Sequence, residues 1–430
     1  MNMGGHCSRR FVTCTARDRL ACKRQHADSG ALKILTSCHR TDNAGGENLA
    51  PQQTAVSVCI NTVIKFLSTV LLGVGVAACG QPTPAPINEP AQVPPKNPTA
   101  WTGVDQTLDA YLKNAGGPLS GYGFAVFDRS GILHDRYGGD YDRDTRVWLA
   151  SATKVPSAAA ILTLVDAGLL DLDEPIATYI EQAGNPILWP ANKRMVTMRM
   201  LLAHTSGLSG NGPAQAKCLL NVLTITLQQC AQLIALAPTL HDPGSAFNYG
   251  GADYQLAGYV ATLIAGVSWQ EFFDQAIALP LQLRSFSYGD PERVHNPRIA
   301  GGATANLTDY VRIMQMLQND GEWNGVRVLS HAAVAMLQAN QIVGMPVVYE
   351  PFSSEDQAKF DGYTLGFWIT DPLQYPGSPG PEFSDPGLFG TTAWIDAGLG
   401  YGAVILIEHS MQTGLQMWSA VRPLLISQLH

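Results

Sequence analysis

The amino-acid sequence predicts a mixed α/β fold of the α+β kind for residues 101–430. Strand-like segments occur near both ends of this stretch and helical segments lie between them, which indicates a sheet completed by both ends of the chain. The 430 residues are 46% hydrophobic and 14% charged, so the chain can bury a large core. This composition excludes wholesale disorder, a collagen and a coiled coil. The length suits two or three domains, or one enzyme fold with an insertion.

The first elements of this stretch alternate between helical and strand-like patterns. Val104–Asn114 has apolar residues at helical spacing. Gly123–Asp128 and Ile132–Tyr137 are strand-like and are joined at Arg129-Ser130-Gly131, as in a hairpin. A helix is expected from about Ala152 to Ala167, and because its apolar positions continue all round, we expect it to be central and buried.

A helix-rich region is predicted over about residues 171–312, and β structure returns after Val347. The helical segments are Arg199–Ala203, Ile225–Leu236, Ala252–Ala265 and Trp269–Ala278. The later strand-like segments are Tyr363–Thr370, Leu388–Ala397 and Tyr401–Glu408, and a last helix is expected over about Gly414–Leu429.

Charge is unevenly spread along the chain. Residues 1–78 carry nine basic and four acidic side chains, which leaves 18 basic against 31 acidic side chains for residues 79–430. A body this acidic repels phosphate backbones, so nucleic acid is not expected as a partner. The sequence contains no C-x-x-C pair and no H-E-x-x-H run, and its ten His are scattered singly, so no metal site is predicted.

Residues 63–78 have the pattern of a signal peptide, an apolar run led by Lys65 that is short for a membrane span and ends in small residues. Cys79 follows directly, and Val76-Ala77-Ala78-Cys79 resembles the bacterial lipobox, which implies cleavage before Cys79 and attachment of lipid to it. An ordinary secretory signal with a chance cysteine is the alternative. Gly80, in place of an acidic residue, implies outer-membrane sorting by the same resemblance.

The segments on either side of this leader are expected to lie outside the folded body. Residues 1–62 place five cysteines and a basic excess ahead of a signal that should be N-terminal, so we interpret them as an over-extended start that the mature protein lacks. Residues 79–100 include seven prolines and are expected to form an extended tether after the lipidated cysteine. The expected protein is an exported lipoprotein, anchored to the membrane and facing the periplasm.

Ser151-Ala152-Thr153-Lys154 is the most informative motif, because it lies where strand-like Val147–Ala150 meets the expected buried helix. Free N–H groups at a helix N-terminus can bind a developing oxyanion. Lys154 lies about 4.5 Å further along the axis on nearly the same face, so its amine can reach the Ser151 hydroxyl. Burial would lower the lysine pKa and leave a neutral amine that activates the nucleophile. Without further context, S-x-x-K is more often a serine N-cap with a solvated lysine.

Five further motifs supply that context. They are Leu201–Leu208, Pro243–Gly251, Gly301–Tyr310, Asn324–Ser330 and Gly387–Thr391. Together with the serine and lysine, their order resembles the serine β-lactamase-related family, which includes class C β-lactamases, D-alanyl-D-alanine peptidases and esterases of the same scaffold. The resemblance covers roughly residues 101–430. It implies an antiparallel sheet flanked by helices, an inserted all-helical lobe, and a site in the cleft between them.

By this resemblance, Ser151 would be the acylated nucleophile, Lys154 its proton partner and Tyr249 the phenol that passes the proton to the leaving group. The backbone N–H groups of Ser151 and Leu388 would form the oxyanion hole. A phenol near a lysine ammonium can have its pKa lowered into a useful range, which suits Tyr249 to this role. A buried aromatic side chain on a turn is the alternative for Tyr249.

Two positions depart from the family pattern, and both bear on substrate binding. The tyrosine motif usually continues to a polar residue, often Asn, but here that position is Gly251, which has no side chain to hold a substrate amide. The third motif usually reads Lys-Thr-Gly or His-x-Gly, and here it reads Asp385-Pro386-Gly387. A carboxylate at that place would repel the carboxylate of β-lactams and D-Ala-D-Ala peptides by about 1–4 kcal/mol. Neutral esters or amides are therefore expected.

His204 and a cysteine pair complete the candidate residues. His204 suggests a Ser-His-Asp arrangement, but no G-x-S-x-G elbow exists, because Gly207-Leu208-Ser209-Gly210-Asn211 lacks the final glycine. We therefore interpret His204 as structural, and the sequence disfavours an α/β-hydrolase. Cys218 and Cys230 lie in a domain expected to be exported and are predicted to form a disulfide, with a free buried pair as the alternative.

The sequence thus predicts a serine hydrolase that acts through a covalent acyl-enzyme and needs no metal or cofactor. Its expected partners are a small ester, amide or peptide substrate and, through the lipid anchor, the membrane; the oligomeric state is not indicated. A carboxylesterase-like enzyme is the leading interpretation. The alternatives are a β-lactamase or D-alanyl-D-alanine carboxypeptidase, and a non-catalytic binding lipoprotein of the same fold, which Gly251 and Asp385 suggest.

Overall fold

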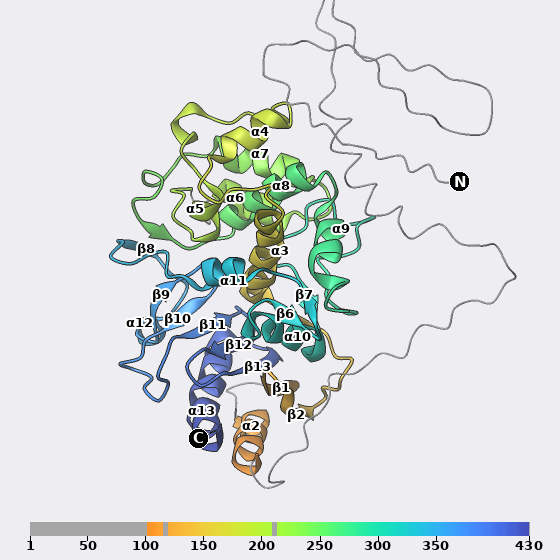
Figure 1. Ribbon diagram of the computed structural model, residues 1–430, viewed down its shortest axis with the longest axis vertical. Coiled ribbons are helices and arrows are strands. Elements are labelled where there is room, and N and C mark those ends of the chain that lie inside the picture. The colour runs from red at the N-terminus through yellow and green to blue at the C-terminus, as the bar shows by residue number, and fades with distance from the viewer. Residues whose placement is uncertain (1–100, 115–118, 209–212, 430) are drawn as a thin grey trace, which may run out of the picture. The chain divides into compact units, whose positions relative to one another are not determined.

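The computed structural model describes residues 101–429 apart from 115–118 and 209–212. This part of the chain forms a seven-stranded sheet in which each strand is antiparallel to its neighbours (Figure 1). In sheet order, the strands are β2 (Gly131–Gly139), β1 (Gly121–Asp128), β13 (Tyr401–Glu408), β12 (Gly390–Asp396), β11 (Glu382–Pro386), β10 (Trp368–Thr370) and β9 (Phe360–Tyr363). The early hairpin pairs with the last strand, which confirms that both ends of the described chain complete one sheet.

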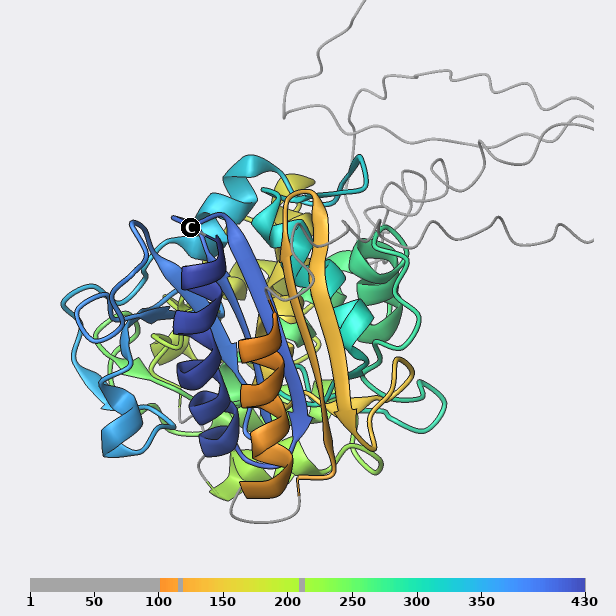
Figure 2. The same cartoon turned by 90° about the horizontal axis from the view of Figure 1, so that it is seen from below.

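Helices cover both faces of this sheet. α2 (Thr102–Asn114) and α13 (Met411–Leu429) lie side by side on one face (Figure 2). α10 (Leu307–Gln318) covers the other face, where it packs on β1 and β13. Because side chains alternate along a strand, Phe124 of β1 joins the hydrophobic cluster under α2 and α13, while Phe127 joins the larger cluster behind the opposite face.

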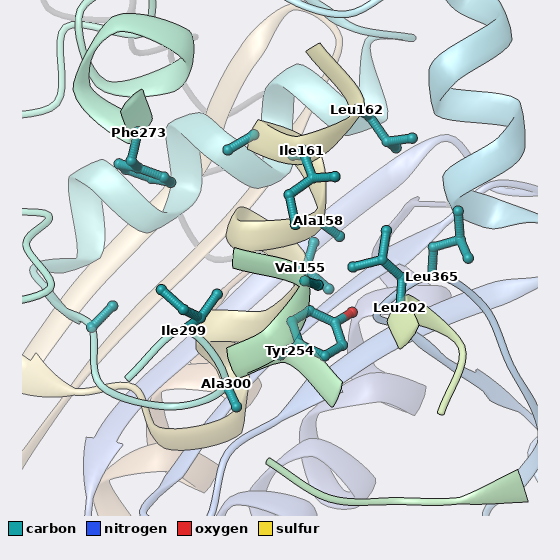
Figure 3. Close-up of a cluster of buried hydrophobic side chains, with 14 of the residues drawn as sticks. Val155, Ala158, Ile161, Leu162, Leu202, Tyr254, Phe273, Ile299, Ala300 and Leu365 are labelled. Atoms are coloured by element: carbon teal, nitrogen blue, oxygen red, sulfur yellow. The ribbon is translucent and has the colours of Figure 1, made fainter. Parts of the chain in front are cut away.

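Helix α3 (Lys154–Asp166) is central and buried, as its continuous apolar pattern predicts. It packs on helix α8 (Ala252–Ala265) and on helix α11 (His331–Gln338). Figure 3 shows Val155 and Ala158 of α3 inside a cluster of buried hydrophobic side chains that extends into the neighbouring helices. The first turn of α3 therefore begins in an apolar interior.

A mostly helical lobe is inserted between α3 and the later strands; it was expected to be all-helical, but the short strand β4 (Phe247–Asn248) interrupts it before α8. Besides α8, its helices are α4 (Ile176–Gln182), α5 (Met198–Leu202), α6 (Pro213–Leu220), α7 (Leu227–Leu236) and α9 (Trp269–Phe273), which the π-helical turn η3 (Asp274–Ala278) continues. A disulfide joins Cys218 of α6 to Cys230 of α7, the two cysteines that the sequence analysis paired. The lobe was expected over about residues 171–312, but α10 begins within that limit and packs on the main sheet instead.

The remaining elements are short. They are β3 (Val147–Trp148) paired with β5 (Thr304–Ala305), β4 (Phe247–Asn248) paired with β8 (Val347–Tyr349), β6 (Glu322–Trp323) paired with β7 (Val326–Arg327), the helix α12 (Ser354–Gln357), and the turns η1 (Ala150–Thr153) and η2 (Ala191–Lys193). Within the described residues, no helix is both long and apolar enough to cross a membrane.

Two sequence expectations about strands are corrected. Tyr363–Thr370 is not one strand, because β9 ends at Tyr363 and β10 begins at Trp368. Gly366, with a φ of +138°, lies in the turn between them, and the Thr364 N–H donates to the Phe367 carbonyl at 2.8 Å. Strand β11 was missed, because Pro386, the preceding Pro381 and two acidic residues are untypical of a strand, although its five positions are all buried.

The predicted signal peptide (63–78), the lipidated Cys79, the tether (79–100) and the extension (1–62) lie outside the described residues.

Candidate active site

Ser151 lies in η1, the tight turn that leads from β3 into α3. Ala150 adopts a left-handed backbone (φ 48°), which changes the direction of the chain immediately before Ser151. The Leu149 N–H donates to the Ala303 carbonyl at 2.9 Å and ties this turn to the loop before β5. As a result, Ser151 stands partly exposed at a pocket while the rest of the turn is buried.

Lys154, in the first turn of α3, is buried and directed at Ser151. Its Nζ lies 3.2 Å from Ser151 Oγ and donates a hydrogen bond of 2.9 Å to the Ala300 carbonyl. Burial lowers the pKa of Lys154 to about 7, since the ammonium loses its hydration; Asp385 partly opposes this shift and Arg298 adds to it. Near neutral pH, a large share of Lys154 is therefore an uncharged amine that can accept a proton.

Tyr249, directly after β4, is the third group at the nucleophile. Its hydroxyl shares a hydrogen bond with the Ser151 side chain, and Lys154 Nζ lies 4.6 Å from its ring centroid. The expected lowering of its pKa is wrong in direction: burial raises the pKa of Tyr249 above its ordinary value, and the nearby Asp385 adds to the increase. Tyr249 is thus a protonated phenol that can donate its proton.

Asp385, at the end of β11, does not face the substrate as the sequence analysis expected. It is 2% exposed and lies beneath the pocket, where it is absent from the lining residues. Its Oδ2 lies 2.7 Å from the Tyr310 hydroxyl, and it accepts a hydrogen bond from the Val155 N–H. The strand directs this carboxyl inward to the N-terminal turn of α3, so repulsion of a substrate carboxylate by Asp385 has no structural basis.

The two contacts of the Tyr310 hydroxyl can be satisfied together when Asp385 is protonated. The Tyr310 hydroxyl lies 2.7 Å from the Ala152 carbonyl and 2.7 Å from Asp385 Oδ2. A hydroxyl has one proton, so both contacts are full hydrogen bonds when Asp385 is protonated and donates to Tyr310. In agreement, burial raises the pKa of Asp385 to about 7, although Tyr310 and Lys154 lower it in part. Asp385 and Lys154 therefore titrate in the same pH range and influence one another.

His204 is part of a buried polar group behind Tyr249. Its Nδ1 lies 3.2 Å from Asp253 Oδ2, and Ser206 donates a short hydrogen bond to the same carboxyl group. The His204 ring centroid is 4.6 Å from that of Tyr249. Burial and the nearby Lys154 hold the pKa of His204 well below its usual value, so it is neutral. Its aromatic contacts support the structural interpretation.

The pocket at Ser151 has a volume of about 400 Å³. Its charged lining side chains, within the described part of the chain, are Lys154 and Arg298. Much of the remaining wall is apolar and comes from α6, the loop after β8, the β11–β12 turn and the start of α13. These apolar residues include Leu219, Leu220, Pro351, Leu388, Phe389 and Met411.

The three remaining candidate residues, Gly251, Gly387 and Leu388, lie in different surroundings. Gly251 lines the pocket at the start of α8, and a Cβ there would come within 2.9 Å of the Leu219 side chain. Gly387 is a packing position, because a Cβ would lie 2.2 Å from the Leu149 carbonyl oxygen. Leu388 lines the pocket with a 60% exposed side chain. Leu388 directly follows Gly387, whose lack of a side chain lets the end of β11 approach the turn that carries Ser151.

Four site groups escaped the sequence analysis. Ala300 contributes only a backbone carbonyl, which no side-chain pattern reveals, although the adjacent Gly301-Gly302 pair was noted. Asp253 is an acidic residue on a mostly apolar helix, and this is a signal that could have marked it. Tyr310 ends the Gly301–Tyr310 motif, but the sequence analysis gave it no role. Arg298 lies in an irregular loop and carries no motif.

A model of the family described as Beta-lactamase matches residues 104–416, so the chain belongs to the beta-lactamase family. Members of this family are typically serine hydrolases. Protein Rv1367c of Mycobacterium tuberculosis (strain ATCC 25618 / H37Rv) is 26% identical over 375 residues, covering 71% of this chain and 90% of its own. Esterase EstB of Burkholderia gladioli is 31% identical over 206 residues, covering 45% of this chain and 52% of its own.

Solved structures show the same fold. EstCE1, described as a hydrolase with promiscuous acyltransferase activity, superimposes with a TM-score of 0.62 at 18% identity, covering 75% of this chain and 98% of that one. At this identity the likeness concerns the fold alone. The antiparallel sheet with flanking helices is therefore the beta-lactamase and penicillin-binding-protein fold that the sequence motifs implied.

The buried pair of Asp385 and Lys154 predicts a specific pH dependence. If the neutral amine of Lys154 is the base, kcat/KM for a neutral aryl ester should fall as pH decreases through about 7. The Asp385→Asn variant keeps a donor for Tyr310 but removes the negative charge that favours the ammonium. The pKa of Lys154 should then decrease, and the acidic limb of the pH profile should move to lower pH.

Asp361→Asn is the matched control, because it makes the same change of charge at an exposed position. Its pH profile should match that of the unmodified protein. An acidic limb that stays in place in Asp385→Asn, or that moves to higher pH, contradicts the coupling between the two buried groups.

Proposed function

We propose that this protein is a carboxylesterase-like serine hydrolase that forms a covalent acyl-enzyme on Ser151 with ester or amide substrates. The observation that carries this proposal is the 3.2 Å contact between Lys154 Nζ and Ser151 Oγ at a site where burial lowers the pKa of Lys154 to about 7. A neutral amine in contact with a serine hydroxyl is the arrangement that general-base activation of the nucleophile needs.

In the acylation step, Lys154 accepts the Ser151 proton as Oγ attacks the substrate carbonyl carbon. The negative charge that develops on the carbonyl oxygen is placed at the backbone N–H groups of Ser151 and Leu388. Tyr249 gives its proton to the departing alkoxide or amine and recovers one from Lys154. Both proton carriers contact the same hydroxyl, so the proton has a short path between them.

In the deacylation step, water attacks the acyl carbon of the ester formed at Ser151. Once the leaving group has departed with its proton, Lys154 is again neutral and Tyr249 is again a phenol. They can therefore accept a proton from the attacking water and return one to Ser151 Oγ. The two side chains thereby return to their starting protonation states at the end of the cycle.

Two features favour an ester over a β-lactam or a D-alanyl peptide. The position where the third motif of family members presents Lys or His holds Asp385, which is buried here, so the pocket has no cation at that position and its guanidinium, Arg298, comes from a different loop. The apolar wall of the pocket suits a hydrocarbon acyl or alcohol group, and the similarity to Esterase EstB agrees with this assignment. Hydrolysis of a 4-nitrophenyl ester compared with a chromogenic cephalosporin distinguishes these activities.

The proton-transfer unit predicts non-additive losses of activity. Ser151→Ala, Lys154→Ala and the double variant should each lose a similar factor in kcat on a 4-nitrophenyl ester, because groups that act together cannot be removed twice. Tyr249→Phe should lose less, about 10²–10⁴-fold, the range for one general acid–base group. Steady-state kinetics on the four variants provides the measurement.

Lys193→Met is the control for the lysine. Lys193 is also buried, and burial lowers its pKa to about 8, but its Nζ donates to the carbonyls of Ala235 and Ala237 inside the lobe. This variant should retain activity per folded molecule. Full activity in Ser151→Ala contradicts the mechanism, and a complete absence of turnover in the unmodified protein on both substrates supports the non-catalytic alternative.

We further propose that the hydrolase is exported and anchored through lipid on Cys79. The support is the sequence alone, an apolar run that ends in Val76-Ala77-Ala78-Cys79. Globomycin should block processing, and Cys79→Ser should release the protein from the membrane fraction in a bacterial host that makes lipoproteins. Detection of peptides from residues 1–62 on the membrane-bound mature protein contradicts this proposal.

A further inference from the structure

Arg298 is a cation in the pocket for which the described part of the chain provides no partner. It lies three residues before Gly301, in the loop that precedes β5, and its side chain lines the pocket beside the nucleophile. Among the described residues, no hydrogen bond or ion pair engages its guanidinium. No Asp or Glu side chain of the described chain lines this pocket either. A half-buried guanidinium is costly unless an acceptor or an anion satisfies it.

The backbone on both sides of Arg298 is fixed by α8. The Gln255 side-chain amide donates to the Pro297 carbonyl at 2.8 Å, and its oxygen accepts from the Ile299 N–H at 3.1 Å. The Arg298 carbonyl itself accepts from the N–H groups of Gly301 and Gly302 at 3.1 and 2.8 Å. The loop therefore presents the guanidinium from a rigid support, which reduces the entropy lost when it binds a ligand.

Arg298 lies close to Lys154 and Ser151, the groups that would carry out the reaction. Two residues later in the chain, the Ala300 carbonyl accepts a hydrogen bond from Lys154 Nζ at 2.9 Å. The Arg298 charge is also close enough to lower the pKa of Lys154. A group bound by the guanidinium would therefore share this pocket with the substrate carbonyl at Ser151.

We propose that Arg298 binds a carboxylate carried by the substrate, so that the enzyme prefers acidic esters or amides, in which one end is a free carboxylate and the rest is apolar. This inference rests on the proposed hydrolase function and names its substrate class. A guanidinium pairs with a carboxylate through two parallel hydrogen bonds. The wall of the pocket is otherwise mostly apolar, and the acidic body of the protein repels larger polyanions.

The preference for acidic substrates reverses the sequence expectation. That expectation placed the Asp385 carboxylate at the substrate, whereas the structure buries Asp385 and leaves Arg298 in the pocket wall. The local charge that a substrate meets is therefore positive.

The test compares esters that differ only in one negative charge. Mono-4-nitrophenyl glutarate and its methyl ester place the carboxylate on the acyl side, and 3-acetoxybenzoate and its methyl ester place it on the leaving-group side. For each pair, the measured quantity is the ratio of kcat/KM for the acid to kcat/KM for its neutral ester. In at least one pair, this ratio should exceed one and should fall about 10- to 100-fold in Arg298→Gln, the effect of losing charge-assisted hydrogen bonds.

The ratio is the appropriate readout because Arg298 also affects Lys154. Loss of the guanidinium raises the pKa of Lys154, which changes the rates on the acid and on its neutral ester by the same factor. Arg298→Lys should retain part of the preference. Arg293→Gln is the matched control, because it removes an exposed arginine from the same region without altering the pocket, and its ratio should be unchanged.

Failure of this inference is distinguishable from failure of the proposed function. If the esters are hydrolysed and neither acid-to-ester ratio of kcat/KM falls in Arg298→Gln, then Arg298 does not bind a substrate carboxylate. If no ester is hydrolysed, the proposed function fails, and calorimetric binding of the glutarate pair to the full chain decides the inference. Tighter binding of the acid that Arg298→Gln abolishes supports a carboxylate site, and equal binding of acid and neutral ester overturns it.

Discussion

The amine of Lys154 lies in an apolar interior, with the Ser151 hydroxyl and the Ala300 carbonyl as its close polar contacts. A charged ammonium is poorly accommodated there, because two neutral oxygens do not replace its hydration. The same burial affects Tyr249 and Asp385 in the opposite sense, since their charged forms are anions and each keeps its proton to higher pH. One environment thus supplies both a neutral base and a proton donor at the nucleophile.

The fold produces this environment from segments that are distant in sequence. The turn η1 provides Ser151 and the start of α3 provides Lys154, the lobe covers α3 with α8, and the end of β11 brings Gly387 against the Ser151 turn. A side chain at Gly387 would collide with the Leu149 carbonyl, so the sheet and the turn can meet closely only at a glycine. The active-site geometry therefore depends on a sheet to which both ends of the described chain contribute strands.

Much of this could be predicted from the sequence, where the signal was local. The all-round apolar pattern of α3, the early hairpin and the Ser151–Lys154 spacing each depend on neighbouring residues, and the structure has all three. The direction of the Asp385 side chain could not be predicted, because it depends on the register of β11, a strand whose proline and acidic residues are untypical of strands. Likewise, the pKa of Tyr249 follows from burial by distant elements, whereas the sequence offered only the nearby lysine.

Direct titration of Lys154 tests the central claim that burial supplies the base. With ¹³C-labelled lysine, the Cε resonance of Lys154 can be assigned by its absence in Lys154→Arg and followed by NMR from pH 5 to 11. A midpoint near pH 7 is the result that the buried amine predicts, well below the value of about 10.4 of an unperturbed lysine side chain. A Lys154 midpoint at or above about pH 10.4 would contradict the account.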